Sequence, residues 1–314
     1  MKSAKPGMDR DTAIMLLRDE LRIVIKNLAE ITDGRISRTY SLDIGGRPCI
    51  LQFTEQNMSQ GCLNERLFAE KFRRMGIPVR SVLHEGEFAG LHFTVAAKVQ
   101  GKGLDRLPRE EFEAVLPSIM DILLRIASVD TSDTVGYGWL EADGNGKFSS
   151  WREHLCQVRE EEPGRFYGRW HHLFDTTFLE RKVFDRYYAK MKELIEAAPS
   201  RRELVHGGFG YGNLLVEQGR VAVVLDWQDA RYGDPVFDLA YMLYWLDEKG
   251  RKACVKAYQE SLKRRGRSEA CLEERVKCYQ YYTGVDGLRF AAKTKNEKFY
   301  RAMLDKLSLL EGTN

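Results

Sequence analysis

The chain has 314 residues, enough for two domains or for two lobes of one fold. Hydrophobic residues make up 43% and charged residues 30%, as in a soluble globular enzyme, and a net charge of +3 is too small to indicate a nucleic-acid or membrane partner. The chain shows no signal peptide, no apolar run long enough to cross a membrane and no C-x-x-C pair among its six cysteines, so we expect a cytoplasmic protein with reduced thiols.

The first hundred residues predict a helix and a small sheet. Apolar residues at helical spacing predict a helix over residues 9–31, with Asp11 as its N-cap. Alternating strands are predicted at residues 40–44, 48–53, 81–85 and 91–97. A further helix over residues 63–75, ended by Gly76, separates the two strand pairs.

From residue 108 onward most of the chain has helical periodicity. A glycine-rich segment, residues 131–148, predicts a loop within this part. The predicted helices are residues 109–128, one beginning at Trp151, 177–198, 236–247, 251–265, 269–294 and 297–310. The order of elements therefore predicts a small β-rich part followed by a larger helical part.

A hairpin with polar ends is predicted within residues 203–240. Two short apolar runs flank Gln218 and Gly219, a pair that suits a tight turn. Counting back from this turn places Asn213 opposite Val224, with Asp226 as its diagonal neighbour on the same face. An amide oxygen and a carboxylate that converge there suit Mg²⁺, although an ordinary hairpin with polar ends would have the same pattern.

Linked motifs in the same stretch carry a resemblance to a known family. The motifs are His206-Gly207-Gly208-Phe209-Gly210-Tyr211-Gly212-Asn213, Leu225-Asp226-Trp227, Gly233-Asp234-Pro235 and Asp238-Leu239-Ala240. In order and spacing they resemble the aminoglycoside phosphotransferase family, most closely its hygromycin B-phosphorylating members. The resemblance implies an α+β, protein-kinase-like fold of two lobes, a small β-rich N-lobe over residues 1–97 and a larger, mainly helical C-lobe over residues 98–314. It also implies transfer of the γ-phosphoryl group of ATP or GTP, with Mg²⁺, to a hydroxyl of an aminoglycoside-like molecule.

The resemblance assigns a nucleotide side to the N-lobe. Ser37 and Thr39 would act in the loop over the phosphates, and Ala97 in the hinge of residues 96–99 that contacts the purine. Glu65 is the helix acid that pairs with a strand cation, but Gln52 stands where that cation is usual. Because glutamine has no charge, we expect its contact with Glu65 to be at best a hydrogen bond. The resemblance also implies that Asn213 and Asp226 hold Mg²⁺.

The position of the family's catalytic Asp is occupied by Gly208, which can neither orient an acceptor hydroxyl nor take its proton. Asp229 is a conceivable substitute base. We expect His206 to pack and hydrogen-bond within the loop, and Asp234 and Asp238 to brace the loop and cap the following helix.

Acidic residues supply candidates for a pocket that binds a cationic acceptor. They are Glu160, Glu161, Glu162, Asp247, Glu248 and Asp286. For the glutamate run, a solvated helix end is the competing interpretation, and for Asp286 a structural role in its helix.

Three functional hypotheses stay open at this point. The first is an active small-molecule kinase, and the second is a pseudokinase that binds nucleotide or ligand without turnover. The third is an active scaffold whose catalytic Asp was replaced by engineering or as a variant.

Overall fold

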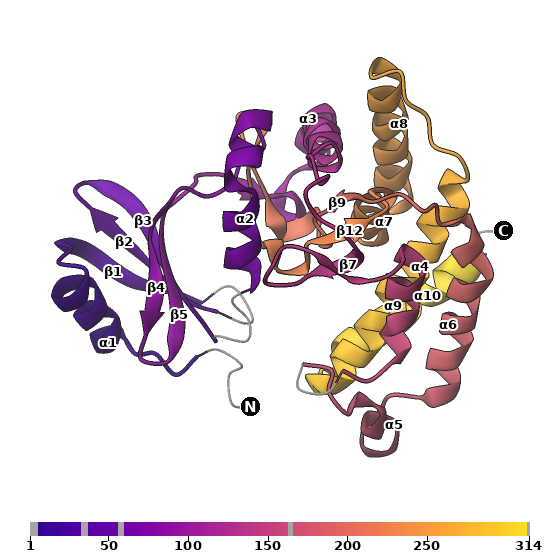
Figure 1. Cartoon of the computed structure of the whole chain (residues 1–314), viewed down its shortest axis with the longest axis horizontal. Helices are drawn as coiled ribbons and strands as arrows, with labels where there is room; N and C mark the ends of the chain where they lie inside the picture. Colours follow the sequence, from indigo (N-terminus) through magenta and orange to yellow (C-terminus); the bar gives the residue numbers. More distant parts are fainter. Residues whose placement is uncertain (1–5, 33–36, 56–59, 163–165, 313–314) are drawn as a thin grey trace. The chain divides into compact units, whose positions relative to one another are not determined.

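The computed structural model describes residues 6–32, 37–55, 60–162 and 166–312 (Figure 1). The chain divides into two compact units that interleave along the sequence. Unit 1 comprises Met1–Arg106 and Asn213–Gln228, and unit 2 comprises Leu107–Gly212 and Asp229–Asn314. The division into lobes at residue 97 stays a prediction. The compact units differ from it because the hairpin after Asn213 belongs with the N-terminal residues.

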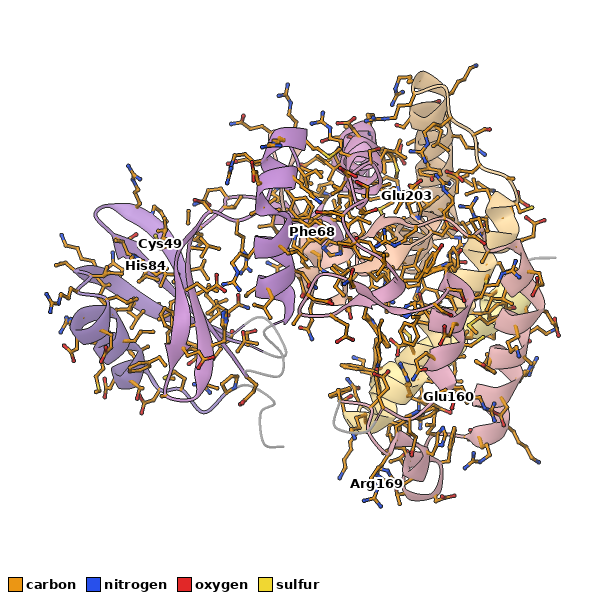
Figure 2. All side chains as sticks on the ribbon, viewed as in Figure 1. Cys49, Phe68, His84, Glu160, Arg169 and Glu203 are labelled. Carbon is orange, nitrogen blue, oxygen red and sulfur yellow. The ribbon has the colours of Figure 1, made fainter. Side chains whose placement is uncertain are left out.

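Unit 1 is built on a five-stranded antiparallel sheet, shown in indigo and purple in Figure 1. Its strand order is β1-β2-β3-β5-β4, with β1 Ile25–Ile31, β2 Arg38–Ile44, β3 Arg47–Glu55, β4 Val82–Phe88 and β5 Leu91–Ala97. One face packs against the short helix α1 (Arg10–Met15) and the π-helical turn Leu16–Glu20. Leu17, Leu51 and Phe53 are fully buried in this core, and Cys49 on β3 (labelled in Figure 2) lies in it as well.

The helix predicted over residues 9–31 is wrong in its second half, which forms β1. A bulge between Lys26 and Ala29, with Asn27 at φ 56°, inserts one extra residue into the strand. Ile25 and Leu28 therefore face the same core although they are three residues apart, a spacing that resembles a helix. The N-cap is Asp9 rather than Asp11, since the Asp9 carboxylate accepts a hydrogen bond of 2.8 Å from the Thr12 amide.

A helix and a hairpin complete unit 1. Helix α2 (Gln60–Met75) packs through Phe72 on Trp227, with 4.3 Å between the ring centroids. Asn64 on α2 donates a hydrogen bond of 2.9 Å to the Trp227 carbonyl. The hairpin strands β10 (Leu214–Glu217) and β11 (Arg220–Val224) form a three-stranded sheet with β6 (Lys102–Gly103), in the order β11-β10-β6. The predicted Gln218-Gly219 turn is confirmed, with φ of 50° and 73°.

Unit 2 is mainly helical. Helix α9 runs through its interior and packs against α6, α7 and α10. The helices are α3 Arg109–Ala127, α4 Trp151–Cys156, α5 Leu173–Thr176, α6 Arg181–Leu194, α7 Val236–Tyr244, α8 Glu248–Arg264, α9 Leu272–Lys293 and α10 Glu297–Gly312. Across both units, short 3₁₀ turns occur at Leu104–Arg106, Gln157–Arg159, Trp170–His172, Ile195–Ala197, Tyr211–Asn213 and Trp227–Asp229. Among the described helices, none has the length and apolar character needed to cross a membrane.

A small sheet anchors the loops of unit 2. Its order is β8-β7-β12-β9, with β7 Tyr137–Leu140, β8 Gly146–Phe148, β9 Glu203–Val205 and β12 Arg231–Gly233. Glu203, labelled in Figure 2, begins β9. The loop predicted over residues 131–148 is therefore wrong, because β7 and β8 form a hairpin there. The close approach of the two strands explains a glycine here, because a Cβ on Gly136 would lie 2.1 Å from the Gly146 carbonyl oxygen.

Candidate active site

The loop that follows β9 in unit 2 is held by the first turn of α7. The buried carboxylate of Asp238 accepts hydrogen bonds from the amides of His206 and Gly207, at 2.7 and 2.8 Å. Burial raises the pKa of Asp238 to about 6, although these two amides act to lower it. The predicted role of Asp238 as a brace is confirmed, but it does not cap the helix. Pro235 occupies the N-cap position.

His206 and the neighbouring glycines fix the path of this loop. His206 is fully buried, and its Nδ1 accepts a hydrogen bond of 3.1 Å from the Gly208 amide, which confirms the packing role. Gly207 has φ 86°, and a Cβ there would lie 2.1 Å from the Asp229 carbonyl oxygen. Gly208 is buried and is not one of the glycines with positive φ. A left-handed backbone therefore does not require glycine at position 208, and the residue there lacks the carboxylate of the family's Asp.

Asp229, the conceivable substitute base, lies on the exposed surface of unit 2. Its side chain is 63% exposed and its carboxylate is 3.7 Å from the guanidinium of Arg231. Its role as a base stays a prediction.

Asp234, from the Gly-Asp-Pro motif, is the centre of a buried ionic cluster in unit 2. Arg275 donates to Asp234 from Nε at 2.8 Å and to Glu269 from Nη1 at 2.8 Å. Tyr279 donates its hydroxyl to Asp234, and Asp234 accepts the Val236 amide at 3.2 Å. Asp234 therefore braces the entry into α7, as expected from the sequence.

Asn213 and Asp226 lie at the two ends of the hairpin in unit 1. The predicted register is wrong by one residue, since Leu214 rather than Asn213 lies opposite Val224. A bulge on β11 after the turn inserts the extra residue, so counting from Gln218-Gly219 fails. The Leu225 amide instead donates to the Asn213 carbonyl at 2.8 Å. Asp226 follows with φ 62°, so strand alternation does not set the direction of its side chain.

The electrostatics of Asp226 suit a cation. Its carboxyl reaches solvent yet lies among many protein atoms, and this desolvation raises its pKa. The Gln228 amide and the charge of Arg80 lower the pKa again, and the charge of Glu65 raises it. Among the described residues, no group of three or more His, Cys, Asp or Glu side chains is arranged to hold a metal ion. One carboxylate and one amide oxygen fit Mg²⁺, which keeps several waters and takes further oxygens from phosphates.

Gln52 and Glu65 are joined through Arg80, and these three residues are called the Arg80 cluster below. Arg80 donates to Glu65 Oε2 from Nε at 3.2 Å and from Nη2 at 2.7 Å, and its Nη1 donates to Gln52 Oε1 at 2.9 Å. Its backbone amide also donates to Glu65 Oε1 at 3.1 Å. The expected direct hydrogen bond between Gln52 and Glu65 is thus replaced by an ion pair with a third residue.

No local sequence pattern indicates this arrangement. Arg80 lies between α2 and β4, and nothing in its local sequence distinguishes it from the other arginines of the chain. Although burial alone would lower it, the charge of Glu65 raises the pKa of Arg80. The guanidinium of Arg80, paired with Glu65, therefore places a positive charge next to β3, although Gln52 itself carries none.

A family model described as "Phosphotransferase enzyme family" matches residues 27–273. The chain belongs to this family. It is 29% identical over 268 residues to the hygromycin-B 4-O-kinase of Escherichia coli, covering 84% of this chain and 74% of that protein. Two crystal structures of a thermostable mutant of aminoglycoside phosphotransferase APH(4)-Ia are also similar. The ternary complex with ADP and hygromycin B has a TM-score of 0.77 at 26% identity, covering 94% of this chain and 96% of that chain. The ternary complex with AMP-PNP and hygromycin B has a TM-score of 0.77 at 25% identity, covering 94% and 97%. These matches confirm the resemblance and the protein-kinase-like fold class.

In this phosphotransferase family member the remaining nucleotide-side residues occupy strand ends of unit 1. Residues 33–36 of the expected phosphate loop lie outside the described residues. Ser37 hydrogen-bonds Thr54 through its hydroxyl, at 3.1 Å, and Thr39 lies opposite Gln52. The Ala97 amide donates to the Ser81 carbonyl at 3.0 Å, so this amide is occupied within the protein. Contacts of Ser37 and Ala97 with a nucleotide stay predictions.

The acidic candidates for acceptor binding belong to unit 2. Glu160 is exposed (Figure 2), whereas Glu162 is 6% exposed and lies 3.5 Å from Lys147. A solvated helix end therefore does not describe the whole glutamate run. Asp286 accepts a hydrogen bond of 2.8 Å from Arg289 on the same helix, which agrees with a structural role. Asp247 caps α8 through the Gly250 amide at 2.8 Å and pairs with Arg109.

Proposed function

We propose that this protein is a cytoplasmic small-molecule O-phosphotransferase. It transfers the γ-phosphoryl group of ATP or GTP to a hydroxyl of a hygromycin-type aminoglycoside, and its turnover is slowed by Gly208. The observation that carries the proposal is the Arg80 cluster, which holds a guanidinium beside β3 in the same unit as Asn213 and Asp226. The family match and the hygromycin-phosphorylating relative support the choice of acceptor.

The roles follow from what phosphoryl transfer requires. Asn213 and Asp226 would hold Mg²⁺, which offsets the negative charge of the nucleotide phosphates when it is bound. Asp238 and His206 hold the loop in which an acceptor hydroxyl would be oriented. Gly208 offers no proton acceptor there, and general-base catalysis is worth about 10²–10⁴-fold in rate. We therefore expect turnover reduced by about this factor, with nucleotide binding retained.

The absence of a side chain at the buried position 208 also favours a second candidate, a pseudokinase that binds Mg²⁺·nucleotide without turnover. A third is an active scaffold that lost its catalytic Asp by replacement. The three candidates share the nucleotide site and differ in what Gly208→Asp does. Because position 208 does not have positive φ, Gly208→Asp forces no left-handed backbone, and Gly208→Asn serves as a control of similar size without a base.

The first experiment is thermal unfolding with and without Mg²⁺·ATP or Mg²⁺·GTP. A ligand at about one hundred times its Kd stabilises the folded state by roughly 2.7 kcal/mol. We expect such a stabilisation for the wild type and none for Asp226→Ala, because the metal-binding carboxylate is lost. No stabilisation of the wild type by either nucleotide would contradict every kinase-like candidate.

The second experiment measures phosphorylation of hygromycin B by the wild type, Gly208→Asp and Gly208→Asn. Measurable wild-type turnover supports the slow kinase. Turnover only in Gly208→Asp indicates a scaffold that lost its base, and no turnover in any of the three indicates the pseudokinase.

A further inference from the structure

The face of the sheet that carries Gln52 differs from the face that packs on α1. Residues directly opposite each other in antiparallel strands share a face. The pairings place four polar side chains in one row across β2, β3, β5 and β4: Thr39, Gln52, Thr94 and Glu85. The neighbouring row, Tyr40, Leu51 and Val95, is apolar and buried in the core. Arg80 reaches the polar row, because its Nη1 hydrogen-bonds Gln52.

We propose that Arg80 binds the α- and β-phosphates of the nucleotide donor and replaces the cation that β3 lacks. This inference rests on the proposed function, because it assumes a nucleotide donor. Gln52 then has a changed role, since its side-chain oxygen orients the guanidinium without neutralising it. Glu65 supplies the carboxylate that fixes the cation, as the helix acid does for a strand lysine.

The donor geometry of Arg80 leaves capacity for a phosphate oxygen. A guanidinium has five N–H donors. Glu65 takes two of them, Gln52 takes one, and the Cys62 sulfur lies 3.9 Å from Nη2. Among the described residues, the second hydrogen of Nη1 has no protein acceptor. The side chain is 16% exposed and lines a cavity of about 570 Å³ within unit 1, so it is not sealed by its partners.

The position relative to Asp226 fits the same assignment. Asn64, next to Glu65, donates a hydrogen bond of 2.9 Å to the carbonyl of Trp227, the residue after Asp226, so the cluster lies close to the metal-binding candidate in the same unit. Phosphates held by a cation on one side and by Mg²⁺ on the other are the arrangement that phosphoryl transfer uses. A purely structural ion pair between α2 and the segment before β4 is the competing role.

The test compares ligands that differ only in phosphate. Dissociation constants for Mg²⁺·ADP and for adenosine are measured with the wild type, Arg80→Gln and Arg66→Gln. Arg66 is the matched control, because it lines the same cavity and is 65% exposed in a long 3.7 Å pair with Glu85. We expect Arg80→Gln to weaken Mg²⁺·ADP binding by about 10–100-fold, as for loss of a charge-assisted hydrogen bond, and to leave adenosine binding within about twofold. Arg66→Gln should leave both within about twofold.

A charge relocation gives an independent check. The double variant Gln52→Lys/Arg80→Gln places a cation on β3. We expect it to bind Mg²⁺·ADP at least tenfold more tightly than Arg80→Gln does. Should Arg80→Gln fail to fold because Glu65 is left unpaired, Glu65→Gln/Arg80→Gln removes that charge and is measured against Glu65→Gln in the same way.

Equal weakening of adenosine and Mg²⁺·ADP binding, or no change in either, would overturn the assignment of Arg80. A wild type that binds Mg²⁺·ADP normally and an unaffected Arg80→Gln would overturn this inference alone. A wild type that binds no nucleotide at all would overturn the proposed function together with it.

Discussion

Replacement of Arg275 by methionine tests the buried ionic cluster of unit 2. Arg275 and Glu269 are each 3% exposed and Asp234 is fully buried, so water cannot substitute for the lost guanidinium. After the change Glu269 keeps Arg201 at 2.6 Å, whereas Asp234 keeps only the Tyr279 hydroxyl and the Val236 amide as the partners described above. Removing one partner of a buried ion pair costs about 3–5 kcal/mol, and we expect Arg275→Met to lower the free energy of unfolding by this amount.

The assay is urea unfolding followed by tryptophan fluorescence. Trp139, Trp151, Trp170 and Trp245 belong to unit 2, so the signal reports mainly on the unit that holds the cluster. The control is Arg301→Met, which removes an exposed pair with Glu297 and should cost no more than about 0.5 kcal/mol.

The double variant Asp234→Asn/Arg275→Met separates charge from packing. It leaves no uncompensated carboxylate at position 234, so we expect it to be more stable than Arg275→Met. A loss below about 1 kcal/mol in Arg275→Met, or equal losses in the single and double variants, would refute the unpaired-charge reasoning.

Two further predictions concern the loop glycines and a buried histidine. Gly207→Ala forces an L-residue to φ 86° with its Cβ 2.1 Å from a backbone oxygen, and we expect it to lose about 1–3 kcal/mol of stability in urea unfolding. Gly212→Ala meets nothing within 4 Å and should be nearly neutral; equal losses in the two would argue against strain. Burial and the charge of Arg231 hold the pKa of His154 well below 6.5, so His154 is neutral when folded and binds a proton when unfolded. As pH falls below about 6.5 the wild type should lose up to about 1.4 kcal/mol per pH unit relative to His154→Gln. A constant gap in the free energy of unfolding between the wild type and His154→Gln from pH 7.5 to 5.5 would contradict the prediction.

The sequence predicted best those features that depend on neighbouring residues. The apolar stripe of α3 and the Gln218-Gly219 turn were correct because both are set within a few positions. Ile25–Ile31 was mistaken for helix because a bulge gives a strand the spacing of three residues that a helix also shows. The register of Asn213 failed for a similar reason, since the bulge on β11 cannot be counted from residue types.

The site contacts that the sequence does not predict join residues far apart in the chain. Taken by itself, Gln52 on β3 predicts the loss of a positive charge at this position. Arg80 supplies that charge from 28 positions further along the chain. Its identification needs the strand pairing and the placement of α2 together, and neither follows from local patterns. By contrast, the role of Asp238 was predictable because its motif carries both the loop and the acid that holds it.

The interleaving of the two units has a consequence for how this protein can change over time. The backbone passes between units after Arg106, Gly212 and Gln228, so the hairpin with Asn213 and Asp226 belongs to the unit of the Arg80 cluster, whereas Gly208 belongs to the other. Under the proposed function, affinity for a nucleotide and the rate of its use would depend on separate cores, and a lineage could lose one trait while selection retains the other. Because the chain passes between the units three times, a protease cut at any single crossing would also leave them covalently linked, and neither unit could be released as one fragment.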